Sequence, residues 1–457
     1  MKRIVSLLLV LLMLAFAFAS CKSAGDENTD SDIESNVGDA TGDISNTQNG
    51  DKTTEKGENN NVTEEDEDNK TEKPTFNVKE SSKGLKFELN PDKLSYTLVG
   101  KGSCTDKEIF IDGYNGLPVT VIGYTAMKGN TTITSVTLGD NVEVIEGYAF
   151  WDCTKITKVT LGKKVRVVGN GAFYGCKAMT SATLGSTLEK ISYRAFYNCT
   201  SLSTINIPDS VLCIGEEAFK NTKYYNTSSN WQSKVLYIGK HLILAETDIS
   251  GSYTIKSGTI SVAEMALRGC TNLTAVTIPD SVKGIGSISF ANCTALKTIN
   301  IGKNVEYLGD RPFINSAYYK DAGNWENNML YLGSYLIAAK TTLTGAITIK
   351  SGTKALCDTV FKNCKNITSV TIPDSVVYIG EYAFFGCSGM TKITIGSGIK
   401  RIGVMAFKDC VALNSVTFKN PDGWEADGIS INKEFLGDKS NAIGQIYLYS
   451  DKTWRRT

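Results

Sequence analysis

The chain has 457 residues, with 48 lysines and arginines balanced by 48 aspartates and glutamates, and it contains one histidine and 12 cysteines. This balance gives no basic excess of the kind that binds nucleic acid, so we expect no nucleic-acid partner. The single histidine, His241, is expected in a hairpin turn between Lys240 and Leu242, which argues against a histidine-based catalytic triad and a multi-histidine metal site.

The N-terminal segment has the order of an export signal. Lys2 and Arg3 precede an apolar stretch at residues 4–18, and small residues follow before Cys21. The stretch is shorter than the roughly 20 residues that a membrane-spanning helix needs, so residues 1–20 are predicted to be a cleaved signal peptide. The ending FASC resembles a bacterial lipobox, which implies that Cys21 becomes lipidated and anchors the protein to a membrane. An ordinary secretory signal with a chance cysteine is the alternative.

Residues 21–74 are predicted to form a disordered, acidic tether behind the lipid. They show no apolar periodicity, almost no aromatic residues and a strong acidic excess. Such a segment cannot bury enough surface to offset its chain entropy, and its like charges extend it. A stalk that displays the rest of the protein is the functional interpretation, and a linker of no selected length is the alternative.

The rest of the chain is built from a repeated unit. A cysteine returns at intervals of 23 residues, which indicates one structural unit copied along the chain. Apolar residues recur at fixed places after each cysteine, and an alternating triplet such as Val276-Thr277-Ile278 predicts a short strand with one buried face. The cysteine series comprises Cys153, Cys176, Cys199, Cys270, Cys293, Cys364, Cys387 and Cys410. Repeats are expected at 130–222, 247–316 and 341–418, with an N-terminal cap and first coil at 75–129 and a C-terminal cap at 419–457.

Two insertions interrupt the repeats, at residues 223–246 and 317–340, and they resemble each other at an offset of 94 residues. Each holds two apolar runs around a turn, which predicts a β-hairpin. Their aromatic residues form two candidate ligand clusters, because aromatic side chains often dominate interface energies. The clusters are Tyr224, Tyr225 and Trp231 in the first insertion, and Tyr318, Tyr319 and Trp325 in the second. Alternatively, each tryptophan pins its hairpin to the flank of the repeats as a local core.

Outward strand positions form another candidate surface. Threonine recurs there, for example Thr277, Thr371 and Thr394, and a row of hydroxyls could accept a protein or a glycan. The alternative is that threonine is present because β-branched residues pack well in strands. Positions 13 and 14 after the cysteine vary more, as specificity-determining positions of repeat scaffolds often do. They include Arg166, Glu189, Lys190, Tyr307, Lys400 and Arg401, and we expect them to be exposed.

The cysteines of the series are expected to be free thiols. Stacked coils would bring them within disulfide range, but side chains in register point the same way, and buried cysteine behaves as a small hydrophobe. Disulfides and a metal site are alternatives, although the close paired spacings of zinc sites are absent. Cys104, Cys213 and Cys357 lie outside the series and are expected to be the more reactive thiols.

The repeat resembles the BspA-like leucine-rich repeat family. Residues 270–293 read CTNLTAVTIPDSVKGIGSISFANC, and the family's 23-residue unit carries the same C-x-x-L-x-x-V-x-I-P-x-S-V-x-x-I-G-x-x-A-F run. The resemblance covers roughly residues 82–420. It implies an α/β-type repeat, a right-handed leucine-rich-repeat solenoid of short parallel strands in about a dozen coils, with the two hairpin units inserted.

The resemblance also implies a function, because most members of the family are bacterial surface proteins proposed to bind host matrix proteins or other cells. We therefore expect a non-enzymatic adhesion or binding protein, lipid-anchored on the bacterial cell envelope, without cofactor, metal or catalytic residues. Its partner would be a protein or glycan on host or neighbouring cells. A structural or antigenic coat without a dedicated ligand is the first alternative. A glycan-active enzyme is the second, and the sequence offers no chemically singular site for it.

Overall fold

The computed structural model describes residues 76–456 except residue 428, and the described residues belong to one compact unit. This unit is a parallel-strand β-solenoid of about 14 turns with little helix, so the solenoid expected from the repeats is confirmed. The signal peptide, Cys21 and the tether lie outside the described residues.

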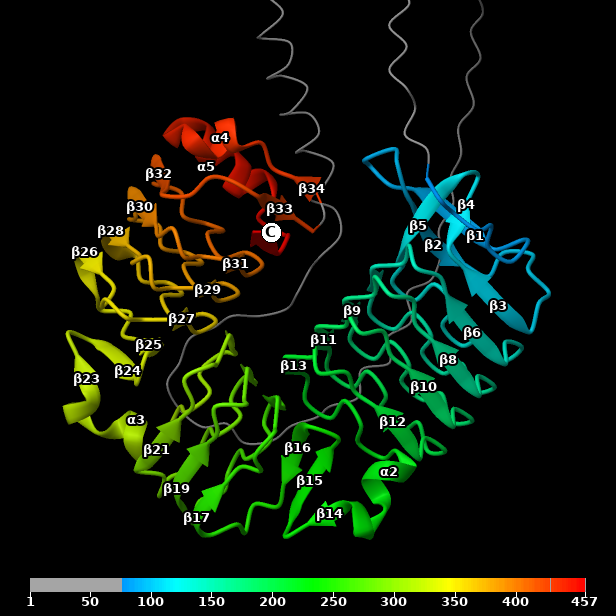
Figure 1. Cartoon of the computed structure of the whole chain (residues 1–457), viewed down its shortest axis with the longest axis horizontal. Helices are drawn as coiled ribbons and strands as arrows, with labels where there is room; N and C mark the ends of the chain where they lie inside the picture. Colours follow the sequence, from blue (N-terminus) through cyan, green and yellow to red (C-terminus); the bar gives the residue numbers. More distant parts are fainter. Residues whose placement is uncertain (1–75, 428, 457) are drawn as a thin grey trace, which may run out of the picture. The chain divides into compact units, whose positions relative to one another are not determined.

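An outer strand from each coil joins one of three parallel sheets on the outside of a curve (Figure 1). Equivalent residues of neighbouring coils pair, as Val159 does with Ala182, because each coil repeats the alternation of its predecessor. The predicted triplet around Thr277 lies in one of these strands. The outer strands are β3 (Glu108–Ile111), β6 (Ser135–Leu138), β8 (Lys158–Thr160), β10 (Ser181–Thr183) and β12 (Thr204–Asn206); β17 (Gly251–Thr254), β19 (Leu273–Ile278) and β21 (Thr298–Ile301); and β26 (Thr344–Thr348), β28 (Asn366–Thr371), β30 (Lys392–Ile395) and β32 (Ser415–Phe418).

The inner strands, which have two residues each from β7 (Val144–Ile145) onward, line the inside of the same curve (Figure 1). In the first third of the solenoid they are β1 (Lys86–Leu89), β2 (Tyr96–Gly100), β5 (Leu117–Ile122), β7 (Val144–Ile145), β9 (Val167–Val168), β11 (Lys190–Ile191) and β13 (Cys213–Ile214), with β4 (Gly113–Tyr114) paired to β5. The later inner strands are β18 (Ser261–Val262), β20 (Gly284–Ile285), β22 (Tyr307–Leu308), β27 (Ala355–Leu356), β29 (Tyr378–Ile379) and β31 (Arg401–Ile402).

Each insertion begins with a short helix and continues as an antiparallel hairpin whose last strand pairs in parallel with the next inner strand. At each insertion one outer sheet and one inner sheet end and new sheets begin. The two insertions therefore divide the solenoid into three blocks. The first unit contains α2 (Lys223–Asn226), η1 (Ser228–Asn230), β14 (Trp231–Gln232), β15 (Val235–Ile238) and β16 (His241–Ala245). The second contains α3 (Ala317–Lys320), η2 (Ala322–Asn324), β23 (Trp325–Glu326), β24 (Met329–Leu332) and β25 (Tyr335–Ala339).

The C-terminal cap adds antiparallel strands to the inner ladder, because β35 (Trp454–Arg456) pairs with both β31 and β33 (Trp424–Ala426). Two helices follow the last outer strand, and the apolar side chains of Leu436 and Ile446 are buried among the final coils. The cap consists of β33 (Trp424–Ala426), β34 (Ile429–Ser430), α4 (Lys433–Gly437), α5 (Lys439–Leu448) and β35 (Trp454–Arg456).

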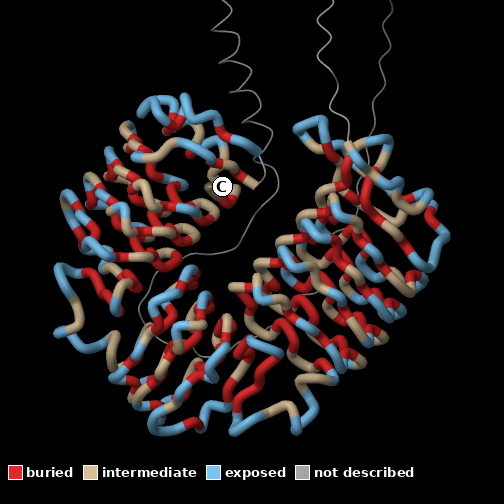
Figure 2. The backbone as a smooth tube through the Cα atoms, viewed as in Figure 1, coloured by how far each residue is buried: buried red, intermediate tan, exposed pale blue. Residues whose placement is uncertain are grey.

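The core is a stack of equivalent side chains, and buried residues fill every coil in Figure 2. Phe150, Phe173 and Phe196 stack face to face with centroids 5.2 and 5.4 Å apart. The series cysteines lie beside this column, and each S–H reaches a backbone carbonyl of the preceding coil, as from Cys176 to Phe150 at 3.2 Å. The repeated cysteine therefore joins coils through a thiol hydrogen bond as well as by packing.

A left-handed backbone position before each series cysteine closes the coil. Asp152, Gly175 and Asn198 have φ values of 53°, 69° and 57°. Glycine, asparagine and aspartate tolerate this conformation better than other residues, which explains their recurrence at this place in the sequence.

Candidate functional site

The first aromatic cluster is built around α2. Thr222 occupies the place of a series cysteine, and its hydroxyl instead caps the helix by accepting from the Tyr225 N–H at 3.1 Å. The Trp231 indole N–H donates to the Tyr225 carbonyl at 2.9 Å, and the Tyr224 hydroxyl donates to the Tyr237 carbonyl at 3.0 Å. All three predicted aromatic residues are half-buried against the core.

The second cluster repeats this geometry. The Trp325 indole N–H donates to the Tyr319 carbonyl at 2.8 Å, and the Tyr318 hydroxyl donates to the Tyr331 carbonyl at 2.8 Å. The Lys340 ammonium lies 5.1 Å from the centre of the Trp325 ring. The two clusters thus hold their hairpins in place and leave only part of each ring in contact with solvent. A ligand-binding role for them remains a prediction.

The outer hydroxyl row comprises the threonines at the seventh position of the coils, including Thr277 on β19, Thr371 on β28 and Thr394 on β30. Asn300 donates to the Thr277 hydroxyl at 3.4 Å, whereas the hydroxyls of Thr371 and Thr394 make no hydrogen bond to any residue that the structure describes. The threonines that lie three residues before this row do use their hydroxyls within the protein. Thr391, for example, donates to the Thr368 carbonyl at 3.0 Å.

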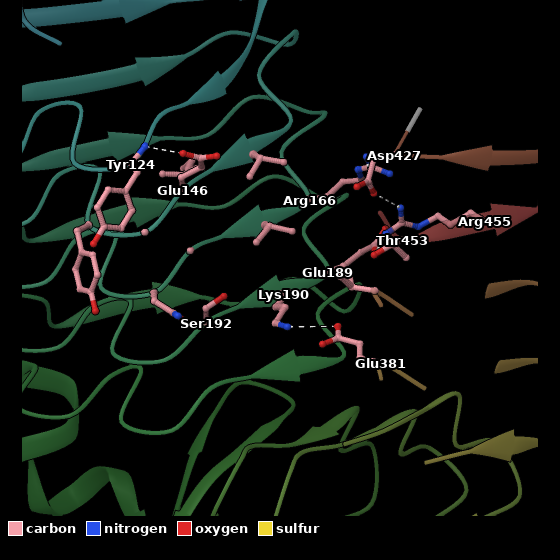
Figure 3. A pocket seen from close by; sticks show the side chains of 18 of the residues that line it. Tyr124, Glu146, Arg166, Glu189, Lys190, Ser192, Glu381, Asp427, Thr453 and Arg455 are labelled. Carbon is pink, nitrogen blue, oxygen red and sulfur yellow. Dashed lines mark hydrogen bonds and ion pairs between the residues drawn. The ribbon is translucent and has the colours of Figure 1, made fainter. Parts of the chain in front are cut away.

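A groove on the inner face has a volume of about 610 Å³ and is the site shown in Figure 3. One wall comes from β7, β9 and β11, and the other from β31 and the C-terminal cap. Tyr124, 63% exposed, lies at one end of the view and Arg455 at the other. The polar and aromatic lining residues are Tyr124, Glu146, Tyr148, Arg166, Asn170, Glu189, Lys190, Ser192, Glu381, Arg401, Asp427, Thr453 and Arg455.

Ion pairs across the groove join coils far apart in sequence. Arg455 on β35 donates to Glu189 beside β11 at 2.6 Å, and Lys190 reaches Glu381 at 3.4 Å. Arg166 and Arg455 lie 3.9 and 3.7 Å from Asp427. Burial raises the pKa of the Asp427 carboxyl, and the neighbouring cations oppose that rise.

Arg401 differs from the other arginines of the groove. Its Nη1 lies 4.0 Å from Glu189, and its guanidinium carbon lies 5.6 Å from the centre of the Tyr378 ring. The guanidinium makes no hydrogen bond to any described residue, and its buried Nε lacks a partner. An arginine held in a groove with its donors unused is a ready partner for an external acceptor.

Below the groove, a buried polar network joins the three blocks. The Asp358 carboxylate accepts the Tyr378 hydroxyl at 2.8 Å, the Glu381 N–H at 2.7 Å and the Tyr307 hydroxyl at 3.2 Å. The Cys213 thiol reaches the Tyr307 hydroxyl at 3.6 Å. Burial raises the pKa of Asp358 well above its usual value.

The variable inner positions were expected to be exposed, and this was wrong for Tyr307, which is 3% exposed. Glu189, Lys190 and Arg401 are half-buried in the groove instead of facing open solvent. Glu189 and Lys190 each have a partner across the curve, Arg455 and Glu381 respectively. The variation at positions 13 and 14 after the series cysteine was the one sequence signal that pointed to groove residues. It did not indicate which of these residues contact one another.

The cysteines in the described part of the chain are free and buried, including the series cysteines. The expectation that Cys104, Cys213 and Cys357 are more reactive was wrong. All three are buried, and burial raises the pKa of Cys213 to about 12 and that of Cys357 well above its usual value. A thiolate is the reactive form, so the raised pKa protects the thiols of Cys213 and Cys357.

His241 was expected in a turn, but it begins β16 and is fully buried. Its Nδ1 lies 2.8 Å from the Ser261 hydroxyl, and burial lowers the pKa of the ring to about 4. Within residues 76–456 no group of acidic, histidine and cysteine side chains is arranged to hold a metal ion. None of the described helices has the length and apolar character to cross a membrane.

The family model for the BspA type leucine-rich repeat region matches residues 120–250, 243–364 and 332–422, in six copies. The chain belongs to this family. Members of the BspA-type leucine-rich repeat family are typically bacterial cell-surface proteins.

The solved structures that are similar to this chain include leucine-rich repeat proteins of bacteria. A leucine-rich cell surface protein of Faecalibacterium prausnitzii is 23% identical over 75% of this chain and 95% of its own, with a TM-score of 0.23. A leucine-rich repeat protein of Eubacterium ventriosum is 22% identical over 72% and 93%, with a TM-score of 0.24. The pneumococcal vaccine antigen PcpA is 15% identical over 81% and 96%, with a TM-score of 0.26. No curated protein sequence matches the chain.

Proposed function

We propose that this BspA-type repeat protein is a non-enzymatic binding protein of the bacterial cell surface, which presents its solenoid to a protein or glycan on host or neighbouring cells. The outer hydroxyl row is the observation that carries the proposal. Thr371 and Thr394 occupy equivalent places on adjacent strands of one sheet, and their hydroxyls are not used within the described part of the protein. Valine has the same β-branched shape as threonine and would pack equally well in these strands, so packing by itself does not account for the hydroxyl.

Many weak hydroxyl contacts suit a partner that is itself extended. Neighbouring strands are about 4.8 Å apart, so the row offers one hydrogen-bonding group per coil at a regular interval. A fibrous protein or a polysaccharide can make several such contacts together, and each added contact benefits from the effective concentration set by the first.

The proposed anchor is a lipid on Cys21, followed by the acidic tether of residues 22–74. Several acyl chains bury enough methylene groups, at about 0.8 kcal/mol each, to hold a protein at a membrane. The variant Cys21→Ala is expected to leave the detergent phase on partitioning and appear in the aqueous phase. Retention of the variant in the detergent phase would contradict lipid anchoring at this residue.

Binding is tested with the full chain in detergent against immobilised host matrix proteins, glycans and intact bacteria. The variant Thr277→Val, Thr371→Val, Thr394→Val removes hydroxyls without changing side-chain shape and is expected to lose a partner of the parent. The matched control, Thr157→Val, Thr391→Val, removes hydroxyls that donate to backbone carbonyls and should keep that partner. Full retention by the first variant would end the proposal, and a parent that binds nothing would favour a coat or spacer.

A further inference from the structure

The strongest unexplained feature of the groove is Arg401. A guanidinium has five N–H donors, yet that of Arg401 makes no hydrogen bond to a described residue and its buried Nε has no partner. Glu189 is close, but it is already bonded to Arg455 at 2.6 Å and lies 4.0 Å from Arg401. Nε is closed off from solvent, so the donors that an acceptor from outside the chain could reach are the two Nη groups, which make no hydrogen bond to a described residue.

The acceptor that fits a guanidinium is a planar carboxylate, because two parallel N–H groups can bond its two oxygens. The Arg401 side chain is 23% exposed, so its head can be reached from the groove. A volume of about 610 Å³ is much more than one carboxylate needs and falls within the range of about 300 to 1,000 Å³ that ligand sites occupy.

The remainder of the groove has the chemistry of a sugar site. The Tyr148 and Tyr124 rings contact each other edge to face at 5.6 Å and line the groove together with Asn170 and Ser192. The side-chain polar groups of these four residues make no hydrogen bond within residues 76–456, and hydroxyl and amide groups can donate to or accept from sugar hydroxyls. Glu146 accepts the Tyr124 backbone N–H through Oε2 at 2.6 Å, and its other carboxylate oxygen can accept from a sugar hydroxyl.

We propose that the groove binds a carboxylated glycan, with a sugar carboxylate on Arg401 and the hydroxyls of sugar units further along the glycan on Tyr148, Asn170 and Ser192. An acidic peptide would satisfy Arg401 but has fewer groups for the hydroxyl and amide side chains at the tyrosine end. This site lies on the inner face, away from the outer hydroxyl row, so the two proposals are tested by different residues and fail independently.

The test uses calorimetric titration of the full chain with a tetrasaccharide that alternates glucuronic acid and N-acetylglucosamine, and with a sialylated trisaccharide. At least one should bind saturably. The variant Arg401→Gln should weaken that binding at least about tenfold, because hydrogen bonds to charged groups contribute roughly 1.5–3 kcal/mol. Arg311→Gln is the matched control, since Arg311 pairs with Asp310 outside the groove and its loss should leave binding unchanged.

A second pair of variants guards against misfolding of the arginine variant. Tyr148→Phe removes one hydroxyl and should weaken binding, whereas Tyr382→Phe, at the equivalent position of a later coil with nearly the same backbone conformation, should not. Four results would overturn the proposal: no saturable binding of either glycan, equal binding of a neutral N-acetylglucosamine tetrasaccharide, equal or tighter binding of a tetraglutamate peptide, or unchanged affinity in both groove variants.

Discussion

Arg455 and Glu189 are 266 residues apart, and their side chains form a hydrogen bond of 2.6 Å inside the curve of the solenoid. The pair links the C-terminal cap to an inner strand of the first block, so the last strand of the chain rests on a coil from its first half. Contacts of this kind are unusual in a repeat protein, in which each unit normally touches only its neighbours.

The variant Glu189→Gln is expected to destabilise the protein by about 1–3 kcal/mol, because Arg455 would lose a charged partner in a half-buried site. Chemical denaturation checks this value. The exposed pair Lys163 and Asp140 provides the control, and Asp140→Asn should leave the midpoint unchanged. Equal effects of the two substitutions would show that the contact across the curve contributes nothing to stability.

The phenylalanine column should tolerate truncation poorly. Phe290 and Phe384 are fully buried, and replacement of either by alanine is expected to cost about 3–5 kcal/mol, since the neighbouring rings cannot collapse into the cavity. Phe435 is exposed, so Phe435→Ala is the control variant and should leave the stability nearly unchanged. A thermal midpoint that does not move for Phe290→Ala would contradict the stacked core.

The buried histidine should make stability depend on pH. Burial lowers the pKa of His241 to about 4, below the unfolded value of about 6.5, so the unfolded chain binds the proton more readily between these values. The contribution of neutral His241 to the free energy of unfolding is therefore complete above pH 6.5. It is lost as the pH falls toward 4, and the total loss is about 3 kcal/mol.

The His241 pKa can be measured directly by NMR, because the chain has one histidine. The second insertion carries Tyr335 at the equivalent place, also buried. The variant His241→Tyr is therefore expected to fold and to lose the drop in stability between pH 6.5 and 4. A ring pKa near 6.5 in the native protein would contradict the burial of His241.

Four buried cysteine thiols should be inert until the solenoid unfolds. Burial raises the pKa of Cys153, Cys199 and Cys213 to about 12 and that of Cys357 well above its usual value, so their reactive thiolate is scarce at neutral pH. Labelling with a thiol reagent is expected to modify these four cysteines only after denaturant is added. Rapid native labelling of Cys213 or Cys357 would show that the inner face opens in solution.

The sequence by itself determined the repeating part of this protein. The interval between cysteines, the apolar places between them and residues such as Asp152 and Asn198 before each cysteine specify a coil, because the same local contacts recur in every copy. The burial of Phe290 follows from the same periodicity. The two hairpins, which interrupt it, follow from the apolar runs on either side of a turn, since strand alternation and turn chemistry act over a few residues.

Only the tertiary structure decided which side chains contact one another on the inner face of the solenoid. The small rotation between successive coils accumulates over the whole stack, and it brings Glu189 to Arg455, Lys190 to Glu381 and Cys213 to Tyr307. No local pattern encodes that sum, so Tyr307 was expected at the surface and Cys213 was expected to be reactive. The groove around Arg401 exists for the same reason: its two walls are far apart in sequence and meet only when every coil is in place.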